Sequence, residues 1–112
     1  MAKGETLGEF EHLVLLAIIR LGNDAYGMQV RRELSACTGR DVSIGAVYAT
    51  LERLTAKAWI GSTLGEATPE RGGRAKRSFY VTGAGIRASN RTRSELAAML
   101  EGLSFPLPES FL

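Results

Sequence analysis

The residues of this sequence that are best placed to do chemistry are cations. Between Arg71 and Ser94 the chain has no acidic residue and seven basic ones, namely Arg71, Arg74, Lys76, Arg77, Arg87, Arg91 and Arg93. The first thirty residues hold four acids and two bases, and the formal net charge of the whole chain is only +2. A basic cluster in a nearly neutral chain is typical of a surface that faces phosphates, and the ordinary alternative is a solvated face.

Catalytic and metal-binding chemistry find little support in the residue types. The chain has one histidine, His12, and one cysteine, Cys37, which cannot form an intramolecular disulfide or the usual Cys/His zinc site. We interpret His12 as structural and Cys37 as a small core residue on an apolar stripe. Glu9 and Glu11 are two residues apart and point to different faces of a helix, so they form a poor acid–base pair. We expect no enzyme, no cofactor and no metal site.

Length and composition favour one folded domain. The chain has 112 residues, of which 45 % are hydrophobic and 23 % charged, and a domain of this size gains stability from an oligomer. The longest apolar run, from Leu13 to Ile19, is shorter than the ~18–20 residues of a membrane span, and the N-terminus has no signal-peptide pattern. We therefore expect a cytoplasmic location and no membrane partner.

Two amphipathic helices are expected in the first third of the chain. The first spans about residues 8 to 21, with a Thr6–Glu9 capping box at its start and a stop at Gly22. The second runs from about residue 26 to residue 37 and ends at Thr38–Gly39. Its inner stripe consists of Tyr26, Val30, Leu34 and Cys37.

A third helix, about residues 44 to 57, has an unusual outer face. Ser43 is its expected N-cap, and its inward residues are Val47, Leu51, Leu54 and Ala58. Tyr48 lies at the border of the two faces. The outer face consists mainly of small side chains, since it holds Gly45, Ala46, Ala49, Glu52, Arg53 and Ala56. A solvated face would normally carry long charged residues, so this one predicts a bulky partner close to the backbone.

The rest of the chain predicts a hairpin and a last helix. One strand begins at Trp59–Ile60 and reaches about Glu66, a polar glycine-rich tip follows, and a second strand spans Lys76 to Val81. Thr82 caps a helix over about residues 83 to 102. Its apolar stripe has no later element to cover it, so we expect a second copy of the chain to do so. The expected dimerisation residues are Ile86, Leu96, Met99, Leu100 and Leu103.

This order of elements predicts a mainly α fold with a small β-hairpin, the winged helix-turn-helix. The expected DNA-binding domain is residues 1–82, with its wing at about 59–82, and residues 83–112 form a dimerisation helix and tail. The third helix would enter the major groove and the wing would reach the backbone or minor groove. The candidate contacts are Ser43, Gly45, Ala46, Ala49, Thr50 and Arg53 on the helix, followed by Lys57, and Arg71, Arg74 and Lys76 on the wing.

The sequence resembles the PadR-like family of transcriptional regulators over roughly residues 7 to 102. The matching blocks are LLAIIRLGNDAYG at residues 15–27, SIGAVYATLERL at residues 43–54, Trp59–Ile60, and GGRAKRSFYVT at residues 72–82. The resemblance implies a homodimeric winged-helix protein, generally a repressor, in the short branch of the family that lacks a large C-terminal domain. It further implies a phosphate contact by Tyr48 and a wing tip at Gly72, Gly73 and Arg74.

Two positions depart from the family pattern. Ala49 stands where the family usually has proline, or a small residue in one subgroup, and Ala58 stands where the family commonly has glycine. If the left-handed backbone is kept at Ala58, it costs on the order of 1 kcal/mol; otherwise the wing leaves the helix by another turn.

Two functions from different classes fit the sequence. The first is a sequence-specific DNA-binding regulator that recognises a pseudo-palindromic operator, with a small apolar effector as an optional ligand between the first and last helices. The alternative is a protein-interaction module whose basic wing binds an acidic partner. The salt dependence of duplex DNA binding separates the two.

Overall fold

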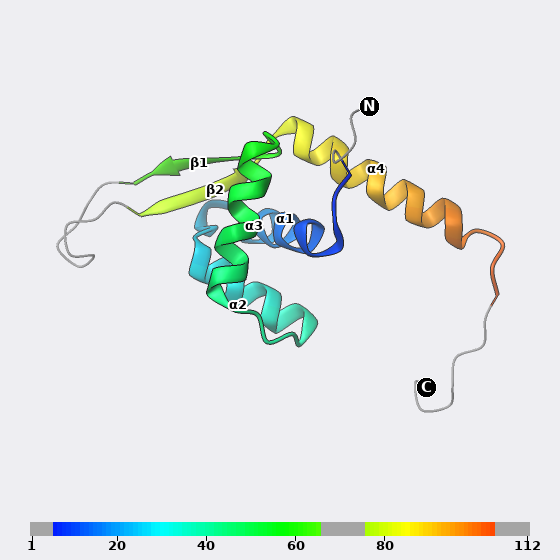
Figure 1. Cartoon of the computed structure of the whole chain (residues 1–112), viewed down its shortest axis with the longest axis horizontal. Helices are drawn as coiled ribbons and strands as arrows, with labels where there is room; N and C mark the ends of the chain where they lie inside the picture. The colour runs from blue at the N-terminus through cyan, green and yellow to red at the C-terminus, as the bar shows by residue number, and fades with distance from the viewer. Residues whose placement is uncertain (1–5, 66–75, 105–112) are drawn as a thin grey trace.

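The computed structural model describes residues 6–65 and 76–104 and has the predicted mainly helical architecture with one antiparallel hairpin (Figure 1). In chain order its elements are α1 (Glu9–Leu21), a 3-10 turn η1 (Gly22–Asp24), α2 (Gly27–Thr38), α3 (Ile44–Ala56), β1 (Ile60–Leu64), β2 (Arg77–Val81) and α4 (Gly83–Leu100). This is the winged helix-turn-helix expected from the sequence. No helix within the described ranges is long and apolar enough to cross a membrane.

Helix α1 begins differently from the prediction. Its N-cap is Gly8, and the Gly8 N–H donates to Glu11 Oε1 at 2.9 Å, so the predicted Thr6–Glu9 capping box is wrong. Leu7 is buried in the core, which places the helix start just after it. The predicted stop is confirmed, because Gly22 has a φ of 60° and its N–H donates to the Ile18 carbonyl.

The two helices of the helix-turn-helix have the expected signals at their ends. Gly39 closes α2 in the left-handed conformation, with a φ of 72°. Ser43 caps α3, since its Oγ accepts the Ala46 N–H at 3.1 Å. Cys37 is exposed, not in the core, because the buried stripe of α2 ends at Leu34 and the last turn lies beyond the core.

Ala58 forms the turn between α3 and the hairpin. Its φ of 62° makes it left-handed, as the family's glycine position suggested, and the strain at a residue with a Cβ is of order 1 kcal/mol. The prediction that Ala58 faces inward is wrong, because α3 ends at Ala56 and the turn exposes Ala58. The next residues, Trp59 and Ile60, return the chain to the core.

The hairpin is anchored to the helical body by its second strand. Strand β2 pairs with β1 from Ile60↔Val81 to Leu64↔Arg77. On its other side, Ser78 forms a bridge with Tyr26, and the Phe79 N–H donates to the Ala25 carbonyl at 2.9 Å. The segment before α2 therefore acts as a short third strand that fixes the base of the wing.

The core lies where α1, α2, α3 and the hairpin base meet. Its fully buried side chains include Val14, Leu15 and Ile18 of α1, Val30 of α2, and Val47, Leu51 and Leu54 of α3. Trp59, Ile60 and Phe79 close it from the hairpin. Burial of apolar surface, which contributes about 25 cal/mol of folding free energy per Å², is the main stabilising term for such a cluster.

Helix α4 packs on this body only through its first turns. Thr82 caps it as predicted, accepting the Gly85 N–H at 3.1 Å, and its hydroxyl donates to the Ala58 carbonyl. Ser89 is buried against α1, with its Oγ 2.8 Å from His12 Nε2. Burial, together with the nearby Arg93 charge, lowers the pKa of His12. This histidine thus joins α1 to α4, which agrees with its structural interpretation.

Gly85 is a position where the α4 backbone lies very close to the base of the hairpin. A Cβ there would collide with the Trp59 carbonyl oxygen and crowd Val81, whereas a Cβ at Gly83 would meet only the Arg87 guanidinium at 3.5 Å. We predict that Gly85→Ala destabilises the fold by ~1–3 kcal/mol, as overpacking does, while Gly83→Ala is neutral or slightly stabilising. Thermal denaturation followed by circular dichroism measures both, and equal melting temperatures for the two variants would contradict the packing described.

Candidate nucleic-acid interface

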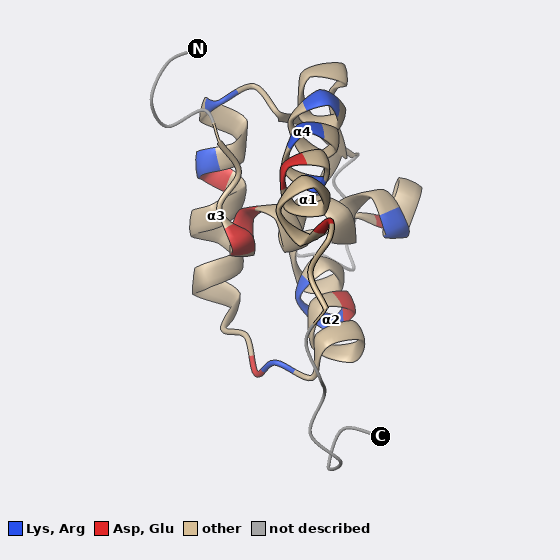
Figure 2. Ribbon diagram, turned by 90° about the vertical axis from the view of Figure 1, so that its right-hand side faces the viewer, with Lys and Arg blue, Asp and Glu red and all other residues tan. Residues whose placement is uncertain are grey.

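The side of α3 opposite the core is exposed and built largely from small side chains. Gly45, Ala46, Ala49 and Ala56 are all exposed, and most of the α3 ribbon is uncharged (Figure 2). Ser43 is exposed at the start of the helix. The predicted outer face therefore exists, and it brings together four of the predicted DNA contacts: Ser43, Gly45, Ala46 and Ala49. Glu52, the one acid of α3, is also exposed there and has no ion pair within the described residues.

Tyr48 lies at the edge of this face, as predicted, with 46 % of its surface exposed. Its ring and hydroxyl occupy the space that a Cβ at Gly27 would fill. Gly27 is buried in the first turn of α2, so α3 can approach α2 closely and hold the tyrosine ring there. Gly27 has no role among the sequence predictions, although it belongs to the block shared with the family.

Thr50 is not part of the exposed face. It is 1 % exposed, so its side chain cannot reach a partner at the surface, and the predicted DNA contact at this position is corrected. The helix turn places residue 50 on the same side as the buried Val47 and Leu54. Its hydroxyl donates to the Ala46 carbonyl at 2.8 Å and accepts from Arg53 Nη2 at 3.0 Å.

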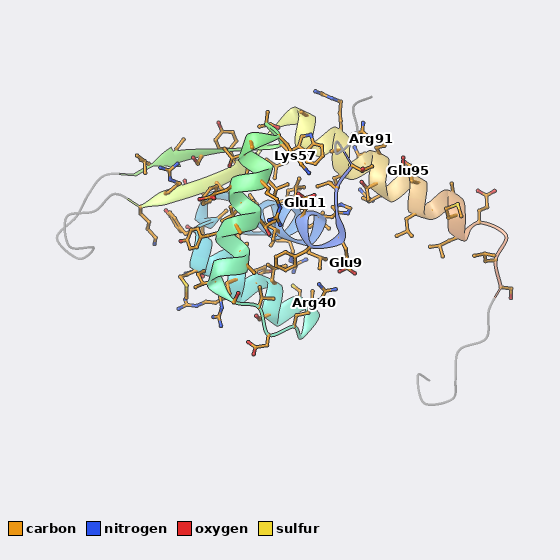
Figure 3. All side chains as sticks on the ribbon, viewed as in Figure 1. Glu9, Glu11, Arg40, Lys57, Arg91 and Glu95 are labelled. Atoms are coloured by element: carbon orange, nitrogen blue, oxygen red, sulfur yellow. The ribbon has the colours of Figure 1, made fainter. Side chains whose placement is uncertain are left out.

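A buried carboxylate ties α1 to the far half of α3. Glu11 is 8 % exposed and accepts from Lys57 Nζ, which lies 3.0 Å from Oε2 (Figure 3). Arg53 Nε lies 3.6 Å from the same oxygen. Burial pushes the pKa of Glu11 up, but the Gly8 N–H, Lys57 and Arg53 outweigh it and hold the pKa below its usual value. Glu11 was predicted only as a poor catalytic group, and a lone glutamate gives no sequence signal for this cross-link.

The two basic residues near the end of α3 differ in availability. Lys57 is bound to both Glu11 oxygens and its Nζ lies 5.0 Å from the centre of the Trp59 ring. Arg53 keeps 55 % of its side chain exposed. Of the predicted basic track along the backbone, Arg53 is therefore the residue presented to the surface.

The base of the wing contributes a second group of cations. Lys76 Nζ lies 3.9 Å from the centre of the Tyr26 ring, a cation–π arrangement. The next residue, Arg77, is exposed and donates to Ser62 Oγ across the hairpin at 3.1 Å. The predicted contacts Arg71, Gly73 and Arg74, together with Gly72, lie outside the described residues.

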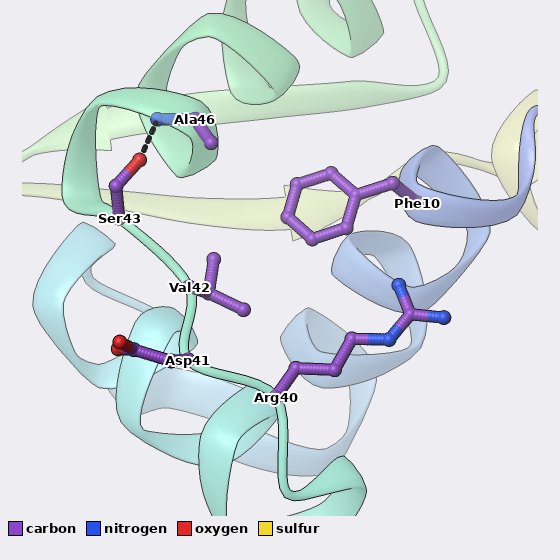
Figure 4. A pocket seen from close by; sticks show the side chains of 6 residues that line it. All are labelled: Phe10, Arg40, Asp41, Val42, Ser43 and Ala46. Carbon is purple, nitrogen blue, oxygen red and sulfur yellow. Dashed lines mark hydrogen bonds between the residues drawn. The ribbon is translucent and has the colours of Figure 1, made fainter.

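Among the described residues, two of the surface depressions border the helix-turn-helix. One of about 590 Å³ lies at the start of α3 and is lined by Phe10, Arg40, Asp41, Val42, Ser43 and Ala46 (Figure 4). Arg40 in its wall is paired with Glu9 at 2.8 Å. The other, of about 150 Å³, lies between α1 and α2. Neither is lined by α4, so neither matches the predicted effector position. The described residues contain no cluster of three or more possible metal ligands.

The second half of α4 carries an exposed apolar stripe. Figure 1 shows the helix extending away from the body. The five predicted dimerisation residues have exposed fractions between 42 % and 75 %: Ile86, Leu96, Met99, Leu100 and Leu103. At 100° per residue, Leu96 and Leu100 continue the side of the helix that buries Gly85 and Ser89 nearer its start, and Leu103 follows three residues after the helix ends.

The order of the helices and the hairpin places this chain in the winged-helix class of folds. A family model described as the transcriptional regulator PadR-like family matches residues 15–91, and the chain belongs to this family, as its sequence blocks indicated. Members of this family are regulators and not enzymes.

Solved structures share the fold at low sequence identity. A transcriptional regulator from Clostridium thermocellum has a TM-score of 0.65 and 21 % identity, covering 80 % of this chain and 81 % of that one. A PadR-like regulator from Bacillus cereus has a TM-score of 0.59, 20 % identity and coverages of 84 % and 93 %. BpsR of Bordetella bronchiseptica, whose DNA binding is regulated by 6-hydroxynicotinic acid, has a TM-score of 0.60, 16 % identity and coverages of 92 % and 72 %. No curated protein sequence matches.

The contact between Tyr48 and Gly27 can be tested without DNA. We predict that Gly27→Ala destabilises the wild-type chain by ~1–3 kcal/mol, because the new methyl group occupies the space of the tyrosine ring. In a Tyr48→Ala background the same change costs little, since the ring is gone. Urea denaturation of the four proteins measures this coupling, and an equal cost of Gly27→Ala in both backgrounds would contradict it.

Proposed function

We propose that this chain is a homodimeric, sequence-specific DNA-binding regulator, acting as a repressor, that places the outer face of α3 in the major groove. The observation that carries the proposal is the exposed face of Gly45, Ala46 and Ala49 opposite a fully buried stripe on the same helix. The major groove is ~12 Å wide and admits one α-helix. Short side chains let the helix backbone approach the base edges, and alanine methyl groups suit contacts with thymine methyl groups.

Phosphate contacts would position α3 in the groove. The Tyr48 hydroxyl lies beside the first turn of α2, where the positive end of the helix dipole favours an anion. Lys76 and Arg77 bring positive charge to the same side through the Tyr26↔Ser78 bridge. The wing-tip residues Arg71, Gly73 and Arg74 extend this surface in the proposal, toward the backbone or the minor groove.

A dimer would form through the second half of α4. Leu96, Met99, Leu100 and Leu103 are too exposed to contribute to the fold of one chain, and burying them against a second copy removes apolar surface from water. A two-fold symmetric dimer binds two half-sites about one helical turn of DNA apart, so the operator would be pseudo-palindromic.

A small apolar effector is a further part of this proposal. One structural neighbour has DNA binding that is regulated by a small molecule. In this chain such a ligand would bind in the space between α1 and α4 of the dimer. A ligand bound there would shift α4.

The DNA-binding surface is tested by salt-dependent binding. We expect fluorescence anisotropy with a duplex selected from a random pool to show log K falling linearly with log salt, because cations that bind phosphates release counterions. Arg74→Ala with Lys76→Ala should weaken binding to all sequences and reduce the slope by about 1 to 2. Arg87→Ala, an exposed cation on α4, serves as the control and should leave the slope unchanged.

Other results would decide against this surface. Binding that is insensitive to salt would contradict phosphate contacts. Retention on an acidic protein, abolished by the same wing variant in the absence of DNA binding, would support the interaction module instead.

The dimer is tested by comparing glutamate substitutions on the apolar face of α4 with one on its opposite face. Leu96→Glu with Leu100→Glu should give a monomer at micromolar concentration in sedimentation velocity, since two charges replace the apolar contact, and should weaken operator binding at least tenfold. Ala98→Glu adds a charge on the opposite side of the same helix and should remain dimeric. A wild-type chain that sediments as a monomer would contradict the proposal.

A further inference from the structure

Arg53 is an exposed cation that the fold holds from two sides. Its Nη2 donates to Thr50 Oγ1 at 3.0 Å, and its Nε lies 3.6 Å from Glu11 Oε2. Within the described residues its remaining nitrogen, Nη1, has no hydrogen-bond partner, and 55 % of the side chain is exposed. An arginine on a helix surface usually samples many rotamers, so two contacts on separate nitrogens restrict the guanidinium strongly.

Thr50 provides a fixed acceptor for this guanidinium. Its hydroxyl has one proton, which it donates to the Ala46 carbonyl one turn earlier on α3. The oxygen lone pairs are then left to accept from Arg53. Since Thr50 is 1 % exposed, water does not compete for that oxygen, and the position of the acceptor is set by the helix backbone itself.

Glu11 fixes the guanidinium relative to α1. Its carboxylate is buried and held by the Gly8 N–H and by Lys57, so it is a rigid group. Arg53 is therefore bound both to its own helix and to the element against which that helix packs.

The position of Arg53 on α3 suits a phosphate contact. It follows Ala46 by seven residues, two helical turns, and so lies on the same side of the helix. This side borders the small outer face proposed to enter the major groove. A cation at the border of a groove-bound helix meets the sugar–phosphate backbone, and a guanidinium binds phosphate best when its fork geometry is already set.

We propose that Thr50 is a positioning residue that holds the Arg53 guanidinium in the orientation that binds a DNA phosphate. This inference rests on the proposed function. It gives the buried hydroxyl of a DNA-facing helix a role in affinity that does not involve touching DNA.

A mutant cycle on DNA binding tests the role of Thr50. Thr50→Val keeps the shape but removes the acceptor, and we expect it to weaken binding to the selected duplex by about 3- to 10-fold, the cost of ordering one side chain on binding. Thr50→Ser keeps the hydroxyl and should bind like the wild type. Arg53→Ala should weaken binding further and reduce the salt slope by about 1. In the Arg53→Ala background, Thr50→Val should have no additional effect.

Two outcomes would overturn the proposal while the wild type still binds DNA. The first is an equal loss from Thr50→Val with and without Arg53, which would mean that the threonine acts through packing. The second is no loss from Thr50→Val at all. A wild type that fails to bind any duplex would instead overturn the proposed function.

The free protein offers a second test that needs neither DNA nor a variant. Nitrogen-15 relaxation of the Arg53 Nε–H group should show an ordered side chain, unlike Arg87 on α4. An Arg53 group as mobile as that of Arg87 would overturn the proposal even if Thr50→Val failed to fold.

Discussion

Burial of one stripe of α3 against the core determines which side of this helix faces outward. Val47, Thr50, Leu51 and Leu54 face the core and are almost completely inaccessible, and this fixes the rotation of the helix about its axis. The small residues Gly45 and Ala49 then point outward because the helix period leaves them no other side. Rotation by one residue would bury a polar or charged group and expose leucine, so the face is strongly specified.

The wing and Tyr48 depend on the segment that leads into α2. Tyr26 pairs with Ser78 of β2 and stacks under Lys76, while its neighbour Gly27 leaves room for the Tyr48 ring. Two consecutive residues thus set the distance between the proposed major-groove helix and the proposed backbone-binding hairpin. A winged helix reads DNA with two elements at once, so their spacing matters as much as their charges.

Local signals predicted the fold well, and long-range contacts accounted for the misses. The helix caps and stops were predicted because each satisfies backbone groups within a few residues, which a sequence displays directly: Ser43, Thr82, Gly22 and Gly39.

The predictions at three helix ends were wrong because burial there depends on which other element lies nearby: Thr6, Cys37 and Ala58. Thr50 was predicted as a surface contact because it lies near the boundary between the two faces of α3, where a shift of one position exchanges a buried for an exposed side chain. The ion pairs of Glu11 were missed since Lys57 and Arg53 lie more than forty residues away in the sequence. The dimer, the wing tip and the remaining DNA contacts stay predictions.

If the outer face of α3 meets DNA, amide chemical shifts report that contact residue by residue. Nitrogen-15-labelled protein titrated with a selected duplex should show its largest shift changes at Gly45, Ala46 and Ala49, with smaller ones at Lys76 and Arg77 and almost none at Val14 in the core. Changes concentrated around the α1–α2 surface near Cys37, with the amides of α3 unmoved, would contradict DNA binding by α3.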